Sequence, residues 1–213
     1  MRGFSALAAA VSLFASVFLS NDAFATPTNF SFTGTLAADD DVQLSSFTTG
    51  SSATVTLRTY GYAGGTQANG NVVPRGGFDP ILALFDSVGN LIALNDDGAD
   101  VTADSVTDAA FDSELSRFLV AGAYTVAISQ SGNSAIGPTL ADGFAEAGSP
   151  FFTAWVGCTN GQFCDVTGDD RTSFWALDVL NAEAAETTPE PSTALLLGLG
   201  LVVLGGTLRR KAP

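Results

Sequence analysis

The sequence predicts an all-β protein with a single domain, built as an antiparallel β-sandwich or jelly roll. Short stretches alternate apolar with small polar residues, as half-buried strands do. Turns rich in glycine, asparagine and aspartate separate these stretches at spacings of roughly ten residues. No long amphipathic helix pattern and no repeat of fixed period competes with this reading of the sequence. Short strands at such spacings are typical of sandwiches and jelly rolls.

The N-terminal segment has the pattern of a secretory signal peptide. Arg2 precedes an apolar run over 4–19, and a small-x-small cleavage pattern ends at Ala25. The alternative is a membrane anchor, but the run is short for a transmembrane span. We therefore expect a signal peptide over 1–25 and a mature domain that begins at Thr26.

Six segments in the middle of the chain have strand patterns. Three of them alternate, and we expect these to be half-buried strands: 29–36, 42–48 and 55–60. Three others are denser in apolar residues, and we expect these to be covered on both faces at the centre of the sandwich: 81–85, 91–94 and 124–128. Two long loops interrupt the strands, over 61–77 and 96–112, and loops of such length are usually functional or mobile. The predicted sandwich domain covers 26–182, and a shift to alanine, glutamate and threonine predicts a linker over 183–188.

The mature part of the chain is strongly acidic. The whole chain has 8 basic and 22 acidic residues; four of the basic and two of the acidic ones lie in the end segments, which leaves four against twenty. The four remaining cations are all arginines: Arg58, Arg75, Arg117 and Arg171. Nucleic-acid binding needs clustered Lys and Arg, so we expect no nucleic-acid partner, and small cations are the natural ligands.

One part of the sandwich has a more specific pattern. An Asp-x-x-Leu-x-Leu strand begins at Asp79, and after a turn a second strand ends in Asn95, Asp96 and Asp97. Further on, Gly122 precedes a Tyr-x-Val strand. These motifs resemble the bacterial pre-peptidase C-terminal domain, a small β-sandwich appended to secreted enzymes. The resemblance covers roughly residues 30–130, and it implies the fold more than an activity.

The clustered aspartates predict a calcium site. Ca²⁺ takes six to eight oxygen ligands from carboxylates, carbonyls and water, and adjacent acids repel one another unless something neutralises them. No cationic residue lies near these acids in the sequence. The alternative is that they form solvated turns, which favour aspartate in any case. The candidate ligands are Asp39, Asp40, Asp41, Asp79, Asp96 and Asp97.

The two cysteines, Cys158 and Cys164, are expected to form a disulfide after export to an oxidising compartment. A disulfide that closes so short a loop stabilises the folded state by roughly 2 kcal/mol, which is enough to fix a local turn. A two-cysteine metal site is the weaker alternative, because the chain has no histidine or further thiol to complete it.

The residue types restrict which reactions are available. The chain has no histidine, and its only lysine is Lys211, so Ser-His-Asp and Cys-His nucleophiles, His-ligated zinc and a Lys Schiff base in the mature domain are excluded. We expect no enzyme and no catalytic residue. The alternative is a surface glycosidase that uses two carboxyl groups about 5 to 10 Å apart, with Trp155 or Trp175 stacked on sugar rings.

Two structural outcomes would separate these functions. A cleft with a carboxyl pair, one raised pKa and an exposed tryptophan would favour the glycosidase. A flat sandwich whose acids crowd one loop edge would favour a binding module that does no chemistry.

The C-terminal segment has three parts in order. The signature Pro189, Glu190, Pro191, Ser192 and Thr193 precedes an apolar run over 194–208, and a basic end follows over 209–211. As a helix, the fifteen apolar residues would span roughly 23 Å, short of the ~30 Å hydrocarbon core, and the basic end would stay on the cytoplasmic side.

This segment, 189–213, resembles the PEP-CTERM sorting tail, which an exosortase of Gram-negative bacteria recognises and cuts. The resemblance implies a protein that is transiently in the inner membrane and is then exported to the cell surface or extracellular matrix. It also implies an association with exopolysaccharide or biofilm. Taken with the sandwich pattern, the chain is similar to an uncharacterised family of PEP-CTERM proteins built on a domain of the pre-peptidase C-terminal type.

Overall fold

The computed structural model describes residues 28–188, so the predicted signal peptide and sorting signature lie outside the described residues. The described part contains eleven strands and two short 3₁₀ helices. In chain order these are β1 Thr28–Thr35, β2 Val42–Thr49, β3 Ala53–Thr59, β4 Gly65–Thr66, β5 Val72–Val73, β6 Pro80–Phe85, β7 Leu91–Asp96, β8 Glu114–Leu119, β9 Gly122–Gln130, η1 Leu140–Asp142, η2 Phe152–Val156, β10 Phe174–Ala182 and β11 Ala184–Thr187.

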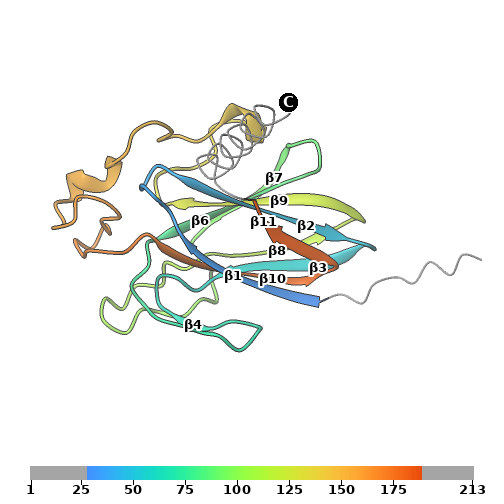
Figure 1. The fold of residues 1–213 in the computed structure, drawn as a ribbon, viewed down its shortest axis with the longest axis horizontal. Helices are drawn as coiled ribbons and strands as arrows, with labels where there is room; N and C mark the ends of the chain where they lie inside the picture. The colour runs from blue at the N-terminus through green and yellow to red at the C-terminus, as the bar shows by residue number, and fades with distance from the viewer. Residues whose placement is uncertain (1–27, 189–213) are drawn as a thin grey trace, which may run out of the picture.

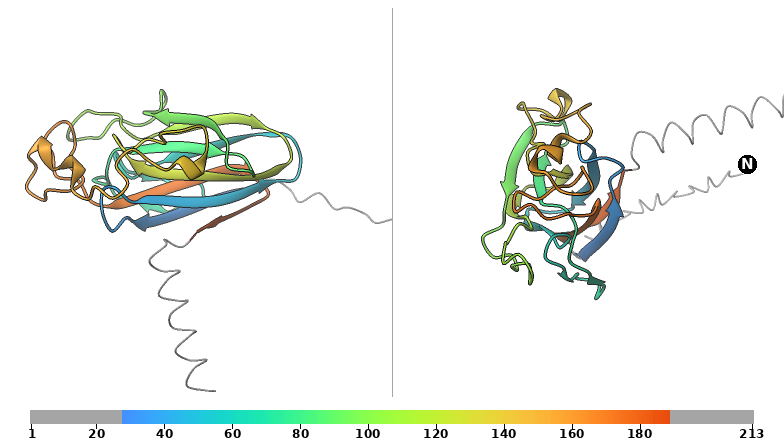
Figure 2. Two further views of the ribbon diagram at one scale, coloured as in Figure 1. Left: turned by 90° about the horizontal axis from the view of Figure 1, so that it is seen from above. Right: turned by 90° about the vertical axis from the view of Figure 1, so that its left-hand side faces the viewer.

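The strands form two antiparallel sheets that pack face to face (Figure 1 and Figure 2). One sheet has the order β1-β10-β3-β8, and the other has the order β11-β2-β9-β6-β7. The short β4 and β5 pair with each other within the loop predicted over 61–77. The predicted all-β sandwich is confirmed, and its sheets are open rather than closed into a barrel.

The core lies between the two sheets and explains the alternating sequence patterns. In β3, Val55 and Leu57 are buried while their neighbours on the strand are half-buried or exposed. They pack in one cluster with Leu82 and Val126 of the facing sheet and with Leu177 of the neighbouring strand β10. Both of these sheets and the cluster between them lie within residues 28–188.

Strands β6 and β9 are covered on both faces, as the dense apolar patterns predict. All six residues of β6 are buried. Its outward residues Ala83 and Phe85 pack against Leu140 and Phe144, because the segment after β9 folds back over this sheet. The third dense segment, 91–94, differs from the prediction. It lies in β7, the edge strand of its sheet, and Leu94 is 43% exposed there.

Residues 183–188 also differ from the expected linker. Ala184–Thr187 form β11, which pairs with the edge strand β2. The backbone N–H of Thr188 donates to the carbonyl of Leu44 at 2.9 Å, and the Gln43 amide donates to the Thr188 carbonyl at 2.9 Å. The unpaired edge of β2 supplies these donors and acceptors. The chain is therefore held to the sheet up to the residue before the sorting signature.

Within residues 28–188, no helix has the length and apolar character needed to cross a membrane.

Candidate functional site

Three of the six candidate aspartates meet at one end of the β6–β7 hairpin. Asp79 directly precedes β6, and Asp96 is the last residue of β7. The antiparallel register places Asp96 opposite Ile81, which is two residues after Asp79. Asp97 follows at once. Carboxylate oxygens of the three residues lie within 4.8 Å of one another.

The backbone around Asp79 is tightly constrained. Gly77 donates its N–H to the Gly61 carbonyl at 2.8 Å, and a Cβ at Gly77 would lie 2.4 Å from the Phe174 carbonyl oxygen. The Asp79 carbonyl accepts the Ser131 N–H at 2.7 Å. The Asp79 side chain is buried, with 6% of the residue exposed, and its Oδ1 has no hydrogen-bond partner. A buried acceptor without a partner is costly, so this oxygen is available to a ligand.

Asp96 and Asp97 are exposed, and the turn that carries them is fixed by hydrogen bonds. Asp97 has a left-handed backbone with φ of 68°, a conformation that aspartate tolerates better than most residues. The Asn95 amide donates to the Asp97 carbonyl at 3.0 Å, and Asn95 Oδ1 accepts the Glu114 N–H at 2.9 Å. The exposed carboxylates are therefore held beside the buried one.

The cluster concentrates negative charge. Burial, together with the charges of Asp96 and Asp97, raises the pKa of Asp79 to about 8. Partial desolvation and the charge of Asp97 raise the pKa of Asp96 above its ordinary value. Desolvation and the charge of Asp165 do the same to the pKa of Asp97.

The arginines that form ion pairs in the described residues do so elsewhere. Arg58 pairs with Glu114, Arg75 with Asp104, and Arg171 with Asp104 and Asp165. The three clustered carboxylates thus have no ion pair with a side chain of the described segment. Their hard anionic oxygens suit a hard cation such as Ca²⁺.

The structure places Asp39, Asp40 and Asp41 outside this cluster, so it brings together only three of the six predicted ligands. Asp39 is fully buried and accepts the N–H groups of Phe151 and Thr153 at 2.7 and 3.0 Å, and the Thr153 hydroxyl at 2.6 Å. Asp40 accepts the Gly148 N–H at 3.0 Å, and Asp41 the Ala38 N–H at 2.7 Å. These acids accept hydrogen bonds within loops and are not part of the carboxylate cluster.

A pocket of about 230 Å³ lies at the same end of the domain. Asp79 is part of its wall, so the pocket adjoins the acidic cluster. The other polar lining residues are Gln130, Ser131, Thr153 and Glu146, and the apolar ones include Phe152, Trp155 and Val166. Gln130 and Glu146 had no part in the predicted site, because only the fold brings these distant segments together.

The two tryptophans have different environments. Trp155 lies in η2 and is 80% exposed at the pocket, whereas Trp175 lies in β10 and is 4% exposed in the core against Gly34. Only Trp155 can therefore contact a ligand. Close to η2, Cys158 and Cys164 form the predicted disulfide.

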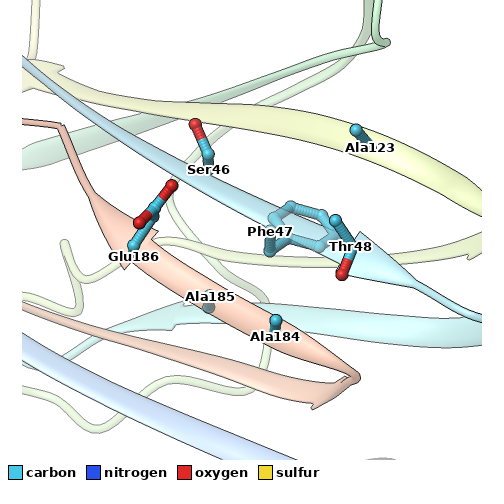
Figure 3. A pocket seen from close by; sticks show the side chains of 7 residues that line it. All are labelled: Ser46, Phe47, Thr48, Ala123, Ala184, Ala185 and Glu186. Carbon is cyan, nitrogen blue, oxygen red and sulfur yellow. The ribbon is translucent and has the colours of Figure 1, made fainter. Parts of the chain in front are cut away.

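A second, larger groove of about 370 Å³ runs beside β11 (Figure 3). Ala123, Ala184 and Ala185 line it together with Phe47, and Glu186 is its one charged lining residue. None of its described lining residues has a buried polar atom without a partner. The groove follows the joint between β2 and β11 and shows no arrangement that would fix the orientation of a ligand.

Fold and site define a small, acidic all-β domain with a carboxylate cluster next to a pocket. At its C-terminal end, residues 187–211 match the PEP-CTERM protein-sorting motif. This motif marks an exported, surface-anchored protein that an exosortase sorts, in agreement with the sorting tail expected from the sequence. Comparison with curated proteins gives no match.

Processing at both ends can be tested directly. We expect mass spectrometry of the mature protein from its own host to give an N-terminus at Thr26 and a chain that has lost 194–213. The expected causes are removal of the signal peptide and a cut near the signature of the sorting motif. A variant with Pro189→Ala and Pro191→Ala should keep the tail. Recovery of an intact tail in the exported, unmodified protein would contradict this prediction.

Proposed function

We propose that the domain is a calcium-stabilised, non-enzymatic binding module at the cell surface or in the matrix of a Gram-negative bacterium, associated with exopolysaccharide or biofilm. One observation carries the cation part of this proposal: the buried Asp79 carboxylate has an oxygen without a partner and lies beside Asp96 and Asp97. The sorting motif supports the location. The hairpin that holds the cluster also carries the resemblance to the pre-peptidase C-terminal domain, and that relationship is part of the proposal.

The chemistry of the cluster favours calcium over magnesium. Three carboxylates on a loop edge supply several oxygens, and water can complete the six to eight ligands that Ca²⁺ takes at about 2.3 to 2.6 Å. Magnesium demands a near-ideal octahedron and gives up its water reluctantly. Asp96 and Asp97 are exposed, so an ion can reach the buried Asp79 from solvent.

Calcium should stabilise the domain of residues 26–188. Extracellular calcium modules bind with dissociation constants on the order of 0.1 to 1 mM, and ten times that concentration adds about 1.4 kcal/mol to the free energy of unfolding. For a domain of this size we expect the melting temperature to rise by roughly 3 to 6 °C between metal-free buffer and about 10 mM calcium. The measurement is a thermal melt followed by circular dichroism.

The double substitution Asp96→Asn/Asp97→Asn should abolish this shift. Asp169→Asn/Asp170→Asn is the matched control, because it removes two charges from another adjacent and exposed pair. An unchanged melting temperature in the unmodified domain would reject the cation site. An equal shift in the Asp96/Asp97 variant would place the ion elsewhere.

A second candidate function, a surface glycosidase, is favoured by one specific observation. The pocket contains Asp79, whose pKa is raised to about 8, together with Glu146 and the exposed Trp155. A protonated Asp79 would be the general acid, and Glu146 the second carboxyl group. The two functions make opposite demands on Asp79, since a general acid must hold a proton whereas a calcium ligand must lose it.

Calcium therefore separates the two functions. If the pocket hydrolyses glycosides, saturating calcium should inhibit the reaction, and Asp79→Asn and Glu146→Gln should each abolish it. We prefer the binding module to the glycosidase for two reasons. Only 6% of Asp79 is exposed, and Asp96 and Asp97, which raise its pKa, belong to the same carboxylate cluster.

A further inference from the structure

We propose that the pocket beside the cation site binds one ring of a neutral saccharide, stacked on Trp155 and hydrogen-bonded to Gln130 and Glu146. This inference deepens the proposed association with extracellular polysaccharide, on which it rests. It names the place on the domain and the chemical class of the ligand.

The pocket has an exposed aromatic side chain at its rim. Trp155 is 80% exposed, although an indole of this size is usually highly buried. Phe152 and Val166 also line the pocket, and Val166 is 66% exposed. An apolar face at the rim of a polar pocket offers a stacking surface to a ring that is apolar on one side.

Several hydrogen bonds hold the segment that presents Trp155. The buried Asp39 accepts three hydrogen bonds from Phe151 and Thr153, at the start of η2. The Thr153 hydroxyl in turn accepts the Cys164 N–H at 3.1 Å, and Cys164 is bonded to Cys158. A surface turn would not need so many anchors. A preorganised side chain loses less entropy on binding.

The wall of the pocket includes a polar side chain with an unpaired oxygen. Gln130 ends β9 with 3% exposure, and its Oε1 has no hydrogen-bond partner. Glu146 is held by its backbone N–H, which donates to Oδ1 of the buried Asn133 at 2.8 Å. An acceptor left without a donor in a pocket is a position that a ligand hydroxyl can fill.

These groups also decide the class of ligand. Gln130 Oε1 and the carboxylate of Glu146 are acceptors, and no arginine of the described segment lines the pocket. Sugar hydroxyls can donate to these acceptors, and a ring carrying its own carboxylate would be repelled by Glu146. The volume of about 230 Å³ is below the roughly 300 to 1,000 Å³ of sites for drug-sized ligands, so it suits a single ring of a longer chain.

The test uses the domain of residues 26–188 with a panel of neutral tetrasaccharides of glucose, mannose and xylose, and with polygalacturonate as the anionic probe. Isothermal titration calorimetry gives the affinities of all variants. Tryptophan fluorescence of the unmodified domain reports contact at Trp155, because the other tryptophan, Trp175, is buried. We expect at least one neutral tetrasaccharide to bind, with its affinity reduced about tenfold or more by Trp155→Ala and by Gln130→Leu. Phe118→Ala is the control, since Phe118 is an exposed aromatic residue on β8 of the other sheet.

The inference is overturned if no neutral member of the panel binds, if Trp155→Ala binds as well as the unmodified domain, or if only polygalacturonate binds. Trp155→Ala should keep its calcium melting shift, and Asp96→Asn/Asp97→Asn should keep its saccharide affinity. If the unmodified domain binds a neutral saccharide but shows no calcium-dependent rise in melting temperature, the cation site is overturned and the saccharide site is not. Cleavage of the tetrasaccharide during the measurement would support the saccharide site and overturn the non-enzymatic part of the proposed function.

Discussion

Replacing Arg171 with alanine should lower the free energy of unfolding by about 3 to 5 kcal/mol, because it leaves two buried carboxylates without their shared cation. Arg171 Nη1 lies 3.6 Å from an oxygen of Asp104, and Nη2 lies 3.2 Å from an oxygen of Asp165. The side chains of both aspartates are fully buried, and that of Arg171 is 2% exposed. The guanidinium carbon also lies 3.7 Å from the ring centre of Tyr62, so the stacking contact disappears too.

The two aspartates would not be affected equally. Asp104 keeps Arg75, whose Nε and Nη2 donate to it at 2.6 and 2.8 Å, and these bonds outweigh burial and hold the pKa of Asp104 well below its usual range. Asp165 keeps only neutral donors, chiefly the Tyr62 hydroxyl. Most of the loss should therefore arise at Asp165, which joins the 163–171 segment to the loop that contains Tyr62.

Thermal and urea unfolding of residues 26–188 measure this effect. For a domain of this size the expected loss corresponds to a fall of roughly 6 to 20 °C in melting temperature. Arg117→Ala is the matched control, because Arg117 lies exposed on β8 and its loss should change the stability by less than about 0.5 kcal/mol. If both variants melted within a degree or so of the unmodified domain, the buried network would contribute nothing to stability.

The sequence predicts the strands whose two faces differ or whose residues are uniformly apolar, and it misses the others for identifiable reasons. In β10 the fully buried Asp178 interrupts an apolar run, and only the fold shows that it accepts the Ala68 N–H at 2.8 Å. In β8, the charged Glu114 and Arg117 hide the apolar sequence pattern of the strand, whose Leu115 and Leu119 are buried. β11 has no pattern of its own, since it becomes a strand by pairing with the free edge of β2.

The candidate site divides in the same way. Asp96 and Asp97 are adjacent, and a hairpin register brings Asp79 to them, so local sequence is enough to predict this group. Asp39 looks the same in the sequence, but its partners Phe151 and Thr153 are more than a hundred positions away. The pocket wall has the same origin, because Gln130, Glu146 and Trp155 meet only after the long segment that follows β9 has folded back over the sheet.

The stability of the metal-free domain should fall as the pH rises from about 4 to about 8. Burial and the neighbouring aspartates raise the pKa of Asp79 from 3.8 to about 8. Between these values the folded domain holds a proton at Asp79 that the unfolded chain has already lost. The free energy of unfolding then decreases with pH, by up to about 1.4 kcal/mol per pH unit, or a few kcal/mol over the whole window. Asp104 has the opposite sign, but its lowered pKa acts only below the window, as the pH falls under about 4.

Asp79→Asn tests this prediction because asparagine has nearly the same shape and no charge at any pH. In metal-free buffer the variant should be about as stable as the unmodified domain near pH 4 and more stable by a few kcal/mol near pH 8, where the unmodified domain must hold a buried carboxylate next to Asp96 and Asp97. Asp100→Asn, at an exposed aspartate, should leave the pH profile unchanged.

Calcium should reduce the difference in stability between the two proteins at high pH. A cation takes the place of the proton on Asp79, so the apparent calcium affinity of the unmodified domain should rise with pH up to about 8 and level off above it. The Asp79→Asn variant should gain little from calcium at any pH. The measurement is urea unfolding at intervals of about one pH unit, with and without calcium. Parallel pH profiles for the two proteins in metal-free buffer would show that Asp79 titrates near its ordinary pKa, and the cluster would then lose the electrostatic argument for a cation.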